Sequence, residues 1–149
     1  MKPCVLVSAC LLGINCRYDG GGKRLDGLNR LTECAQPIPV CPEIYGGLPT
    51  PRTPSERCGT RVINRDGRDV TAQYERGAGE ALKLARLFDA KCALLKERSP
   101  SCGSGEIYDG SFSGTRTAGD GVTAELLKKN GIAVFGETEL DALIAFLSL

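Results

Sequence analysis

The sequence predicts a Rossmann-like α/β fold, with a mostly parallel four-stranded sheet, helices on both faces and a small β-hairpin insertion at about residues 61–70. Short apolar runs alternate along the chain with segments of helical periodicity, which is typical of a parallel sheet covered by helices. The 149 residues suit one domain with a continuous core. The 42% hydrophobic and 25% charged residues are ordinary for a globular protein, so we expect a single domain over residues 1–149.

The first third of the chain contains two predicted strands and one helix. Residues 3–8 (PCVLVS) form a continuous apolar run, as in a strand buried on both faces. Leucines recur at three-residue spacing within residues 24–35, which predicts a helix that Pro37 ends. A second short strand is expected at residues 38–41. The Gly- and Pro-rich residues 42–54 form a long loop, and such loops are usually functional.

The hairpin insertion is predicted around Asp66-Gly67, because this pair supplies hairpin-turn geometry. Thr71 is a candidate N-cap for a helix that continues to about residue 89. The rest of the chain is predicted to contain a strand at residues 92–95, an irregular Gly- and Ser-rich stretch at 107–117, a helix at 121–130, a strand at 132–135 and a closing helix at 137–149.

Three cysteine-bearing motifs follow the first three predicted strands: Ser-Ala-Cys at 8–10, Cys-Pro-Glu at 41–43 and Ser-Pro-Ser-Cys-Gly at 99–103. The carboxyl ends of parallel strands meet at one edge of the sheet, where ligands bind in such folds. We therefore expect Cys10, Cys41 and Cys102 to converge there and to form a metal site with a vacant position. Cys16 is either a fourth ligand or a nearby thiol without a role. The remaining cysteines are expected to be structural or incidental: Cys4, Cys34, Cys58 and Cys92.

Composition narrows the possible chemistry. The chain has no His, which excludes Ser–His and Cys–His catalysis and His-ligated zinc. The Cys-x-x-Cys pairs of structural zinc are absent, whereas iron–sulfur clusters accept widely separated thiolates, and three thiolates on a four-iron cube leave one iron open. The net charge of +1 disfavours nonspecific DNA binding. No signal peptide or membrane-spanning run is recognised, so we expect a cytoplasmic protein with reduced cysteines.

Four stretches together resemble the thiouracil desulfidase family, also known as the TudS or YbbK-like family: SACLLGINCRYDGG, CPEIYGGLPTPRTPSE, LKERSPSCGSGEIYDGSFSG and GDGVTAELLKKNGIAVFGE. The resemblance spans nearly the whole chain and implies a [4Fe-4S] cluster held by Cys10, Cys41 and Cys102 with one open iron. It favours a spectator role for Cys16. It also implies the removal of sulfur from 2- or 4-thiouracil or 4-thiouridine monophosphate, giving the carbonyl product and hydrosulfide without net redox change.

The motifs also contain candidate catalytic residues. An open iron is thiophilic and would draw electrons from a C=S carbon, exposing it to water. Glu43, two residues after Cys41, is the candidate base for that water. Ser99 or Ser101 is expected to donate to the substrate or relay a proton. The structural alternatives are a surface or capping role for Glu43 and loop hydrogen bonds for the serines.

Candidate substrate-binding residues lie in three loops. Forked donors on Arg17 and Arg52 suit a phosphate or a pyrimidine oxygen, although they suit neighbouring loops equally well. Aromatic rings at Tyr108 or Phe112 suit stacking on a base. The other polar or Gly-loop candidates are Tyr18, Asp19, Ser111, Ser113 and Gly114.

Two alternatives to a desulfidase stay open at this point. The first is a cluster-dependent hydratase, dehydratase or lyase that uses the open iron on an oxygen ligand. The second is a non-enzymatic metal- or nucleotide-binding domain in which a cluster only joins three loops. A free base, a nucleotide and thiolated tRNA all stay open as substrates, with a small molecule favoured because no added basic domain is present. The oligomeric state is not predicted.

Overall fold

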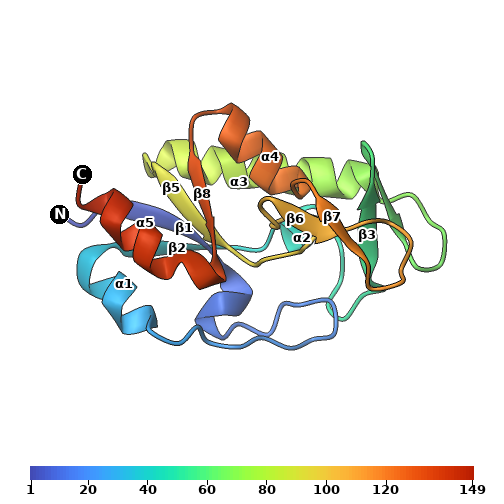
Figure 1. Ribbon diagram of the computed structural model, residues 1–149, viewed down its shortest axis with the longest axis horizontal. Helices are drawn as coiled ribbons and strands as arrows, with labels where there is room; N and C mark the ends of the chain where they lie inside the picture. The colour runs from blue at the N-terminus through green and yellow to red at the C-terminus, as the bar shows by residue number, and fades with distance from the viewer.

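The computed structural model describes all 149 residues of the chain. Its centre is a four-stranded sheet in the order β2–β1–β5–β8, and every neighbouring pair is parallel (Figure 1). The strands are β1 (Cys4–Ser8), β2 (Gln36–Val40), β5 (Cys92–Leu95) and β8 (Ala133–Gly136). The predicted Rossmann-like α/β fold class is thereby confirmed.

Helices cover both faces of this sheet, as Figure 1 shows. Val5 and Val7 of β1 pack into one core cluster with α1 (Leu28–Cys34) and α5 (Leu140–Leu147). Leu6, between them in the sequence, packs into a second cluster with α3 (Thr71–Leu87) and α4 (Val122–Lys129). Alternate side chains of a strand point to opposite faces, so a continuous apolar run buries both of them.

The hairpin insertion begins earlier in the chain than the sequence predicted. Its strands are β3 (Ser55–Cys58) and β4 (Arg61–Asn64), which pair antiparallel across a turn with Gly59 at φ 63°. Asp66-Gly67 forms the next turn, as predicted, and the chain returns antiparallel beside β4: Ile63 and Asp69 form a bridge, the Asn64 N–H donates to the Arg68 carbonyl at 2.8 Å, and the Val70 N–H donates to the Val62 carbonyl at 2.9 Å. The pairing expected at 61–70 is therefore present, and the correction is the additional strand β3, which extends the insertion to residues 55–70.

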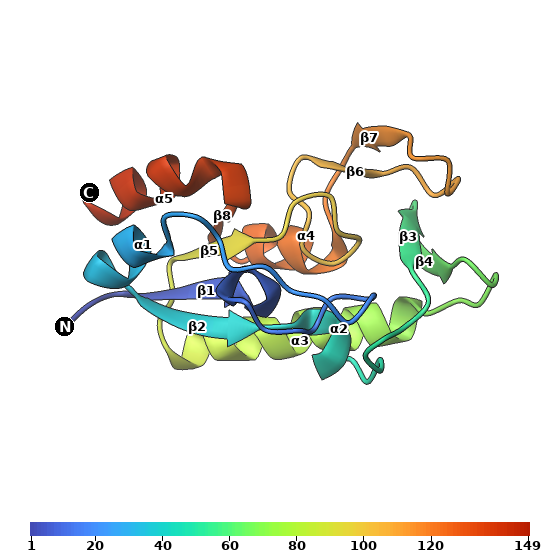
Figure 2. The same cartoon turned by 90° about the horizontal axis from the view of Figure 1, so that it is seen from below.

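A second hairpin occupies the stretch that was expected to be irregular. It consists of β6 (Glu106–Tyr108) and β7 (Arg116–Ala118). Both strands are short and largely exposed, so they lack the apolar alternation that marks a strand. In Figure 2 both hairpins lie beyond the carboxyl ends of β1, β2 and β5.

Two short helices were not expected from the sequence, η1 (Ala9–Leu12) and α2 (Pro42–Tyr45), and the closing helix predicted at 137–149 is divided into η2 (Glu137–Glu139) and α5. Both η1 and α2 follow strands and carry residues of the Ser-Ala-Cys and Cys-Pro-Glu motifs. Thr71 begins α3 instead of preceding it as an N-cap, and its N–H donates to the Asp69 carboxylate at 2.9 Å. No helix of the chain has the length and apolar character needed to cross a membrane.

Candidate active site

A cavity of about 380 Å³ lies at the carboxyl ends of β1, β2 and β5, and its lining residues come from the segments after these strands and from the two hairpins. The segments after the three strands form its inner wall. The β3–β4 and β6–β7 hairpins contribute its outer wall, including Ser55, Arg65 and Phe112. This is the position at which parallel α/β sheets bind ligands.

Cys10, Cys41 and Cys102 all line this cavity. Cys10 lies in η1 directly after β1, Cys41 follows β2, and Cys102 lies in the loop after β5. Cys10 and Cys102 are buried, and Cys41 is half-buried. No group of Cys, Asp and Glu side chains is arranged to hold a single metal ion. The structure thus brings the three predicted residues to one cavity, while their role as cluster ligands stays a prediction.

The thiols of Cys10 and Cys102 lie in an environment that keeps them protonated in the absence of a metal. Burial raises the pKa of Cys10 to about 11, although the charges of Lys96 and Arg17 oppose the shift. Burial also raises the pKa of Cys102 to about 12, against hydrogen bonds from Ser101 and Ser8. The Ser101 hydroxyl donates to Sγ of Cys102 at 3.4 Å. Metal binding would therefore release protons from these residues.

Cys16 lines the same cavity and is buried. Its carbonyl oxygen accepts hydrogen bonds from the Cys41 thiol at 3.7 Å and from Arg52 Nη2 at 3.0 Å. Burial and the neighbouring Cys41 raise the pKa of Cys16 to about 12. Because Cys16 lies in the cavity beside Cys41, its position does not test the predicted spectator role, which stays a prediction. The other four cysteines lie outside the cavity lining.

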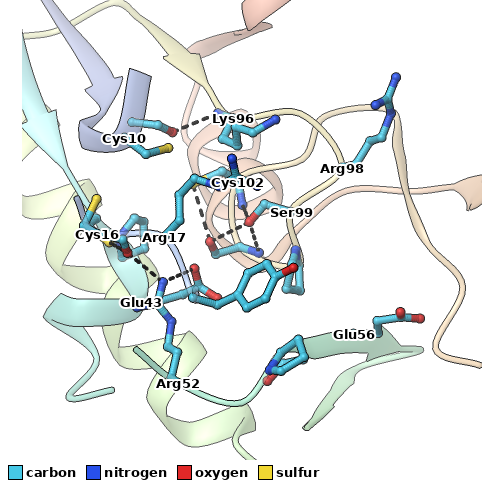
Figure 3. A pocket seen from close by; sticks show the side chains of 18 of the residues that line it. Cys10, Cys16, Arg17, Glu43, Arg52, Glu56, Lys96, Arg98, Ser99 and Cys102 are labelled. Atoms are coloured by element: carbon cyan, nitrogen blue, oxygen red, sulfur yellow. Dashed lines mark hydrogen bonds and ion pairs between the residues drawn. The ribbon is translucent and has the colours of Figure 1, made fainter. Parts of the chain in front are cut away.

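Glu43 lies in the first turn of α2, and its carboxylate faces the cavity with the side chain 16% exposed. Its Oε2 accepts a hydrogen bond from Arg52 Nη2 at 2.9 Å, and its Oε1 accepts one from the Tyr74 hydroxyl. Figure 3 shows Glu43 beside Arg52 and Cys16, with Arg98 and Glu56 further out. Tyr74 was not singled out from the sequence, because no motif connects a tyrosine in α3 with a carboxylate in α2.

Arg52 is engaged with the protein itself. Its Nη1 donates to the Pro49 carbonyl and to Oγ1 of Thr50, each at 3.2 Å, and its Nη2 bonds to Cys16 and Glu43. Its side chain is 4% exposed. Arg52 lines the cavity as expected, but its terminal nitrogens hold the loop and Glu43, and contact with a substrate stays a prediction.

Ser99 and Ser101 both line the cavity. Ser99 Oγ accepts the backbone N–H groups of Ser101 and Cys102, each at 3.1 Å, and therefore shapes the loop that carries Cys102. The two hydroxyl oxygens are 3.1 Å apart. Ser101 is 1% exposed, and its hydroxyl contacts the sulfur of Cys102.

Most of the predicted substrate-binding residues line the cavity: Arg17, Tyr18, Arg52, Tyr108, Phe112 and Gly114. Asp19, Ser111 and Ser113 do not. The Asp19 carboxylate accepts the Gly21 N–H at 2.9 Å. The Ser111 hydroxyl donates to Asp109 at 2.5 Å and lies 2.6 Å from that of Ser113, so these groups satisfy one another along an exposed turn.

Three further basic residues line the cavity and were not selected from the sequence: Arg65, Lys96 and Arg98. Lys96 pairs with Glu137 at 2.8 Å. The guanidinium group of Arg65 lies over the ring of Phe112, 5.5 Å from its centroid, and joins the two hairpins. Their positions depend on how the hairpins fold over the sheet edge, which local sequence patterns do not specify.

A parallel α/β sheet with three cysteines and a carboxylate around a cavity at its strand ends defines a Rossmann-like protein with a thiol-rich cavity. Residues 5–139 match the sequence profile of a family described as 2-thiouracil desulfurase. The chain therefore belongs to the 2-thiouracil desulfurase family, which confirms the predicted family and its class of enzyme, a desulfidase.

Two relatives agree with this membership. An uncharacterized protein, YbbK of Bacillus subtilis (strain 168), is 41% identical over 150 residues, which cover 94% of this chain and 99% of YbbK. A solved structure described as the [4Fe-4S]-dependent thiouracil desulfidase TudS is 49% identical, with a TM-score of 0.94 over 99% of both chains.

Proposed function

We propose that this protein is a [4Fe-4S]-dependent, non-redox desulfidase that removes sulfur from a thiolated pyrimidine and leaves the carbonyl compound and hydrosulfide. One observation carries the proposal: Cys10, Cys41 and Cys102 line the same cavity as Glu43. The likeness to a protein described as a [4Fe-4S]-dependent thiouracil desulfidase supports it, as does membership of the 2-thiouracil desulfurase family.

The chemistry of the donor set fits an iron–sulfur cluster. Three thiols from three separate segments would hold three irons and leave the fourth open. Hydroxyl donors at Ser8 and Ser101 contact the sulfur of Cys102, and such contacts tune cluster potentials. When bound, the cluster supplies a thiophilic Lewis acid that polarises the thiocarbonyl group.

Glu43 is the residue that we assign to the attacking water. Its bonds with Arg52 and Tyr74 occupy two lone-pair positions of the carboxylate, and the others are available to a water in the cavity. Glu43 would take a proton from that water as the water oxygen attacks the thiocarbonyl carbon. We assign donation to the substrate to Ser99, because its Oγ only accepts backbone N–H groups and keeps its own proton, whereas the single proton of the Ser101 hydroxyl is donated to the sulfur of Cys102.

The outer part of the cavity is basic and aromatic. Arg17 and Arg65 line it without an ion pair to any acidic side chain, and Arg98 lies 3.6 Å from Glu106. A pyrimidine next to Tyr108 or Phe112 would place a 5′-phosphate near these guanidinium groups. We infer that the substrate is a small molecule, a thiolated base or its mononucleotide, with the phosphate lowering KM.

Sulfide release by the anaerobically reconstituted protein tests the proposed function. The substrates are 2-thiouracil, 4-thiouracil and 4-thiouridine monophosphate, and the variants are Glu43→Gln and, as a matched control on the exposed face of α3, Glu75→Gln. We expect sulfide and the carbonyl product from wild type and from Glu75→Gln, and a kcat at least about 100-fold lower for Glu43→Gln. Equal rates for Glu43→Gln and wild type would remove Glu43 from the mechanism.

The two alternatives give different results in the same experiment. A cluster-dependent hydratase or lyase would bind iron and release no sulfide from any thiolated pyrimidine. A non-enzymatic domain would bind thiolated nucleotide and leave it unchanged. Either result would contradict the proposed function.

A further inference from the structure

Tyr74 lies near the start of α3 and is buried beneath the cavity, with 1% of its surface exposed. Its hydroxyl donates a hydrogen bond to Oε1 of Glu43. The two residues are 31 positions apart and lie on different helices. A buried tyrosine hydroxyl normally requires a partner, and here that partner is the carboxylate assigned to the attacking water.

The contact is held by a close approach of α2 to α3. A β-carbon at Gly46 would lie 1.9 Å from the Gln73 carbonyl oxygen, and one at Gly77 would lie 1.8 Å from the Pro42 carbonyl oxygen. Both values are far below any real contact, so the two glycines allow the backbones to touch. Because Glu43 follows Pro42 directly, this contact determines the distance between the Glu43 carboxylate and α3.

The carboxylate of Glu43 is restrained at both oxygens. Arg52 Nη2 holds Oε2 at 2.9 Å, and the Tyr74 hydroxyl holds Oε1. Two separate donors on opposite oxygens prevent the carboxylate from turning about its last torsion angle, which is otherwise soft. The lone pairs that remain free are therefore kept in one orientation relative to the cavity.

The phenol of Tyr74 is a permanent donor in this arrangement. Burial, followed by the neighbouring charge of Glu43, raises the pKa of Tyr74 far above its ordinary value, so the hydroxyl keeps its proton. Ser55 on β3, which lines the cavity, lies close enough to the same hydroxyl to oppose this shift. A chain of polar groups thus runs from the β3–β4 hairpin through Tyr74 to Glu43.

We propose that Tyr74 is a positioning residue for Glu43: its hydroxyl, together with Arg52, fixes the carboxylate in the orientation that receives the proton of the attacking water. Tyr74 itself does not touch the substrate, since it is absent from the cavity lining. The proposal rests on the proposed function, because it assigns Glu43 the role given there. It predicts an effect on turnover with little effect on substrate binding.

The test compares Tyr74→Phe with Tyr45→Phe in the reconstituted protein. Tyr45 is a matched control, because its hydroxyl donates to a backbone carbonyl, that of Pro39, at 2.9 Å and lies outside the cavity. We expect kcat for sulfide release to fall about 10- to 100-fold in Tyr74→Phe, the size typical of supporting hydrogen-bond partners. KM should stay within about threefold of wild type, because uniform binding is not affected. Iron content and the visible spectrum should be unchanged, and Tyr45→Phe should resemble wild type.

Several results would overturn the proposal. A kcat for Tyr74→Phe within about twofold of wild type would do so, as would a rise in KM alone. A lower melting temperature with unchanged kcat would assign Tyr74 a purely structural role. If Tyr74→Phe does not fold, Ser55→Ala provides the second measurement: a fall in kcat of about two- to tenfold at unchanged KM supports the chain of contacts, and unchanged kcat contradicts it.

Failure of this inference is distinguishable from failure of the proposed function. Wild-type protein that releases no sulfide contradicts the proposed function. Active wild type with inactive Glu43→Gln and fully active Tyr74→Phe contradicts only the role of Tyr74.

Discussion

The carbonyl oxygen of Pro42 occupies the space in which a side chain at Gly77 would begin, 1.8 Å from the position of a β-carbon there. Gly77 lies in the interior of α3, where glycine is ordinarily unfavourable by about 1 kcal/mol relative to alanine. Its presence allows α2, which begins directly after Cys41 and carries Glu43, to lie against α3. The position of Glu43 therefore depends on a contact between two backbones.

Gly77→Ala is expected to destabilise the protein in spite of the better helix propensity of alanine. Relieving the overlap requires a shift of α2, and overpacking of this kind costs about 1–3 kcal/mol. Gly79→Ala, two residues further along the same helix, is the control, because a β-carbon at Gly79 meets no atom within 4 Å. Urea unfolding should show a lower free energy of unfolding for the first variant and an equal or higher one for the second. Equal stability of both variants would contradict the packing described for α2.

The pair formed by Arg52 and Glu43 is expected to contribute far more to stability than an ion pair at the surface. Arg52→Met would leave Glu43 partly buried without its cation, and breaking such pairs costs about 3–5 kcal/mol when burial is complete. With Glu43 16% exposed, we expect the lower end of that range, about 3 kcal/mol. Arg30→Met breaks a pair whose side chains are 57% and 85% exposed, so its effect should stay below about 1 kcal/mol. Unfolding curves of Arg52→Met, Arg30→Met and the double variant Glu43→Gln/Arg52→Met give their free energies of unfolding. Similar losses of stability in Arg52→Met and Arg30→Met would contradict this prediction.

Asp120 is expected to make stability depend on pH in the acid range. Burial alone would raise its pKa, but the Lys128 ammonium and the Gly105 N–H, each 2.8 Å from the carboxylate, outweigh this effect and lower the pKa. The ionised form therefore stabilises the fold fully above the unfolded pKa of about 3.9, and this stabilisation is lost as pH falls through the lower folded pKa. Melting temperatures measured from pH 6 down to about pH 2.5 should fall less steeply for Asp120→Asn than for wild type. Asp26→Asn, at an exposed position, should keep the wild-type slope; the prediction fails if all three proteins show the same slope.

Cysteine substitutions are expected to divide into two groups by iron content. Serine at position 10, 41 or 102 should prevent full assembly of the cluster, because each thiol is proposed to hold one iron. Cys16→Ser should keep wild-type iron, although Cys16 lies in the same cavity beside Cys41. The exposed Cys58 provides a control for the general effect of losing a thiol. Iron and acid-labile sulfide per chain, measured after anaerobic reconstitution, test the division, and loss of iron in Cys16→Ser would make it a ligand.

The parallel sheet could be predicted because its strands are buried on both faces. Residues 92–95 are apolar throughout and fully buried, and the predicted bounds equal those of β5. The hairpins were harder: the Asp66-Gly67 turn after β4 was recognisable, but β3, which pairs with the other side of β4 across Gly59, has no apolar alternation. Short exposed strands such as β6 and β7 carry no apolar pattern at all.

The residues of the inner cavity wall were more predictable than those of the outer wall and than the buried residues that contact the wall from behind. Strand ends meet at one sheet edge in every parallel sheet, so Cys10, Cys41 and Cys102 could be placed there from their spacing after strands. Tyr74 and Arg65 reach the site from α3 and from the β3–β4 hairpin, and their positions depend on tertiary packing. Asp19 and Ser111 have the right chemistry for a ligand, but local hydrogen bonds in their own turns satisfy them instead.

We propose that three thiols hold a cluster at which a thiocarbonyl sulfur is exchanged for the oxygen of water without electron transfer. Reaction of the reconstituted protein with 4-thiouracil in oxygen-18-labelled water, with no reductant or oxidant added, tests it most directly. We expect uracil that carries the label, together with one sulfide for each uracil formed. Unlabelled uracil, or turnover that requires an added electron donor, would contradict it.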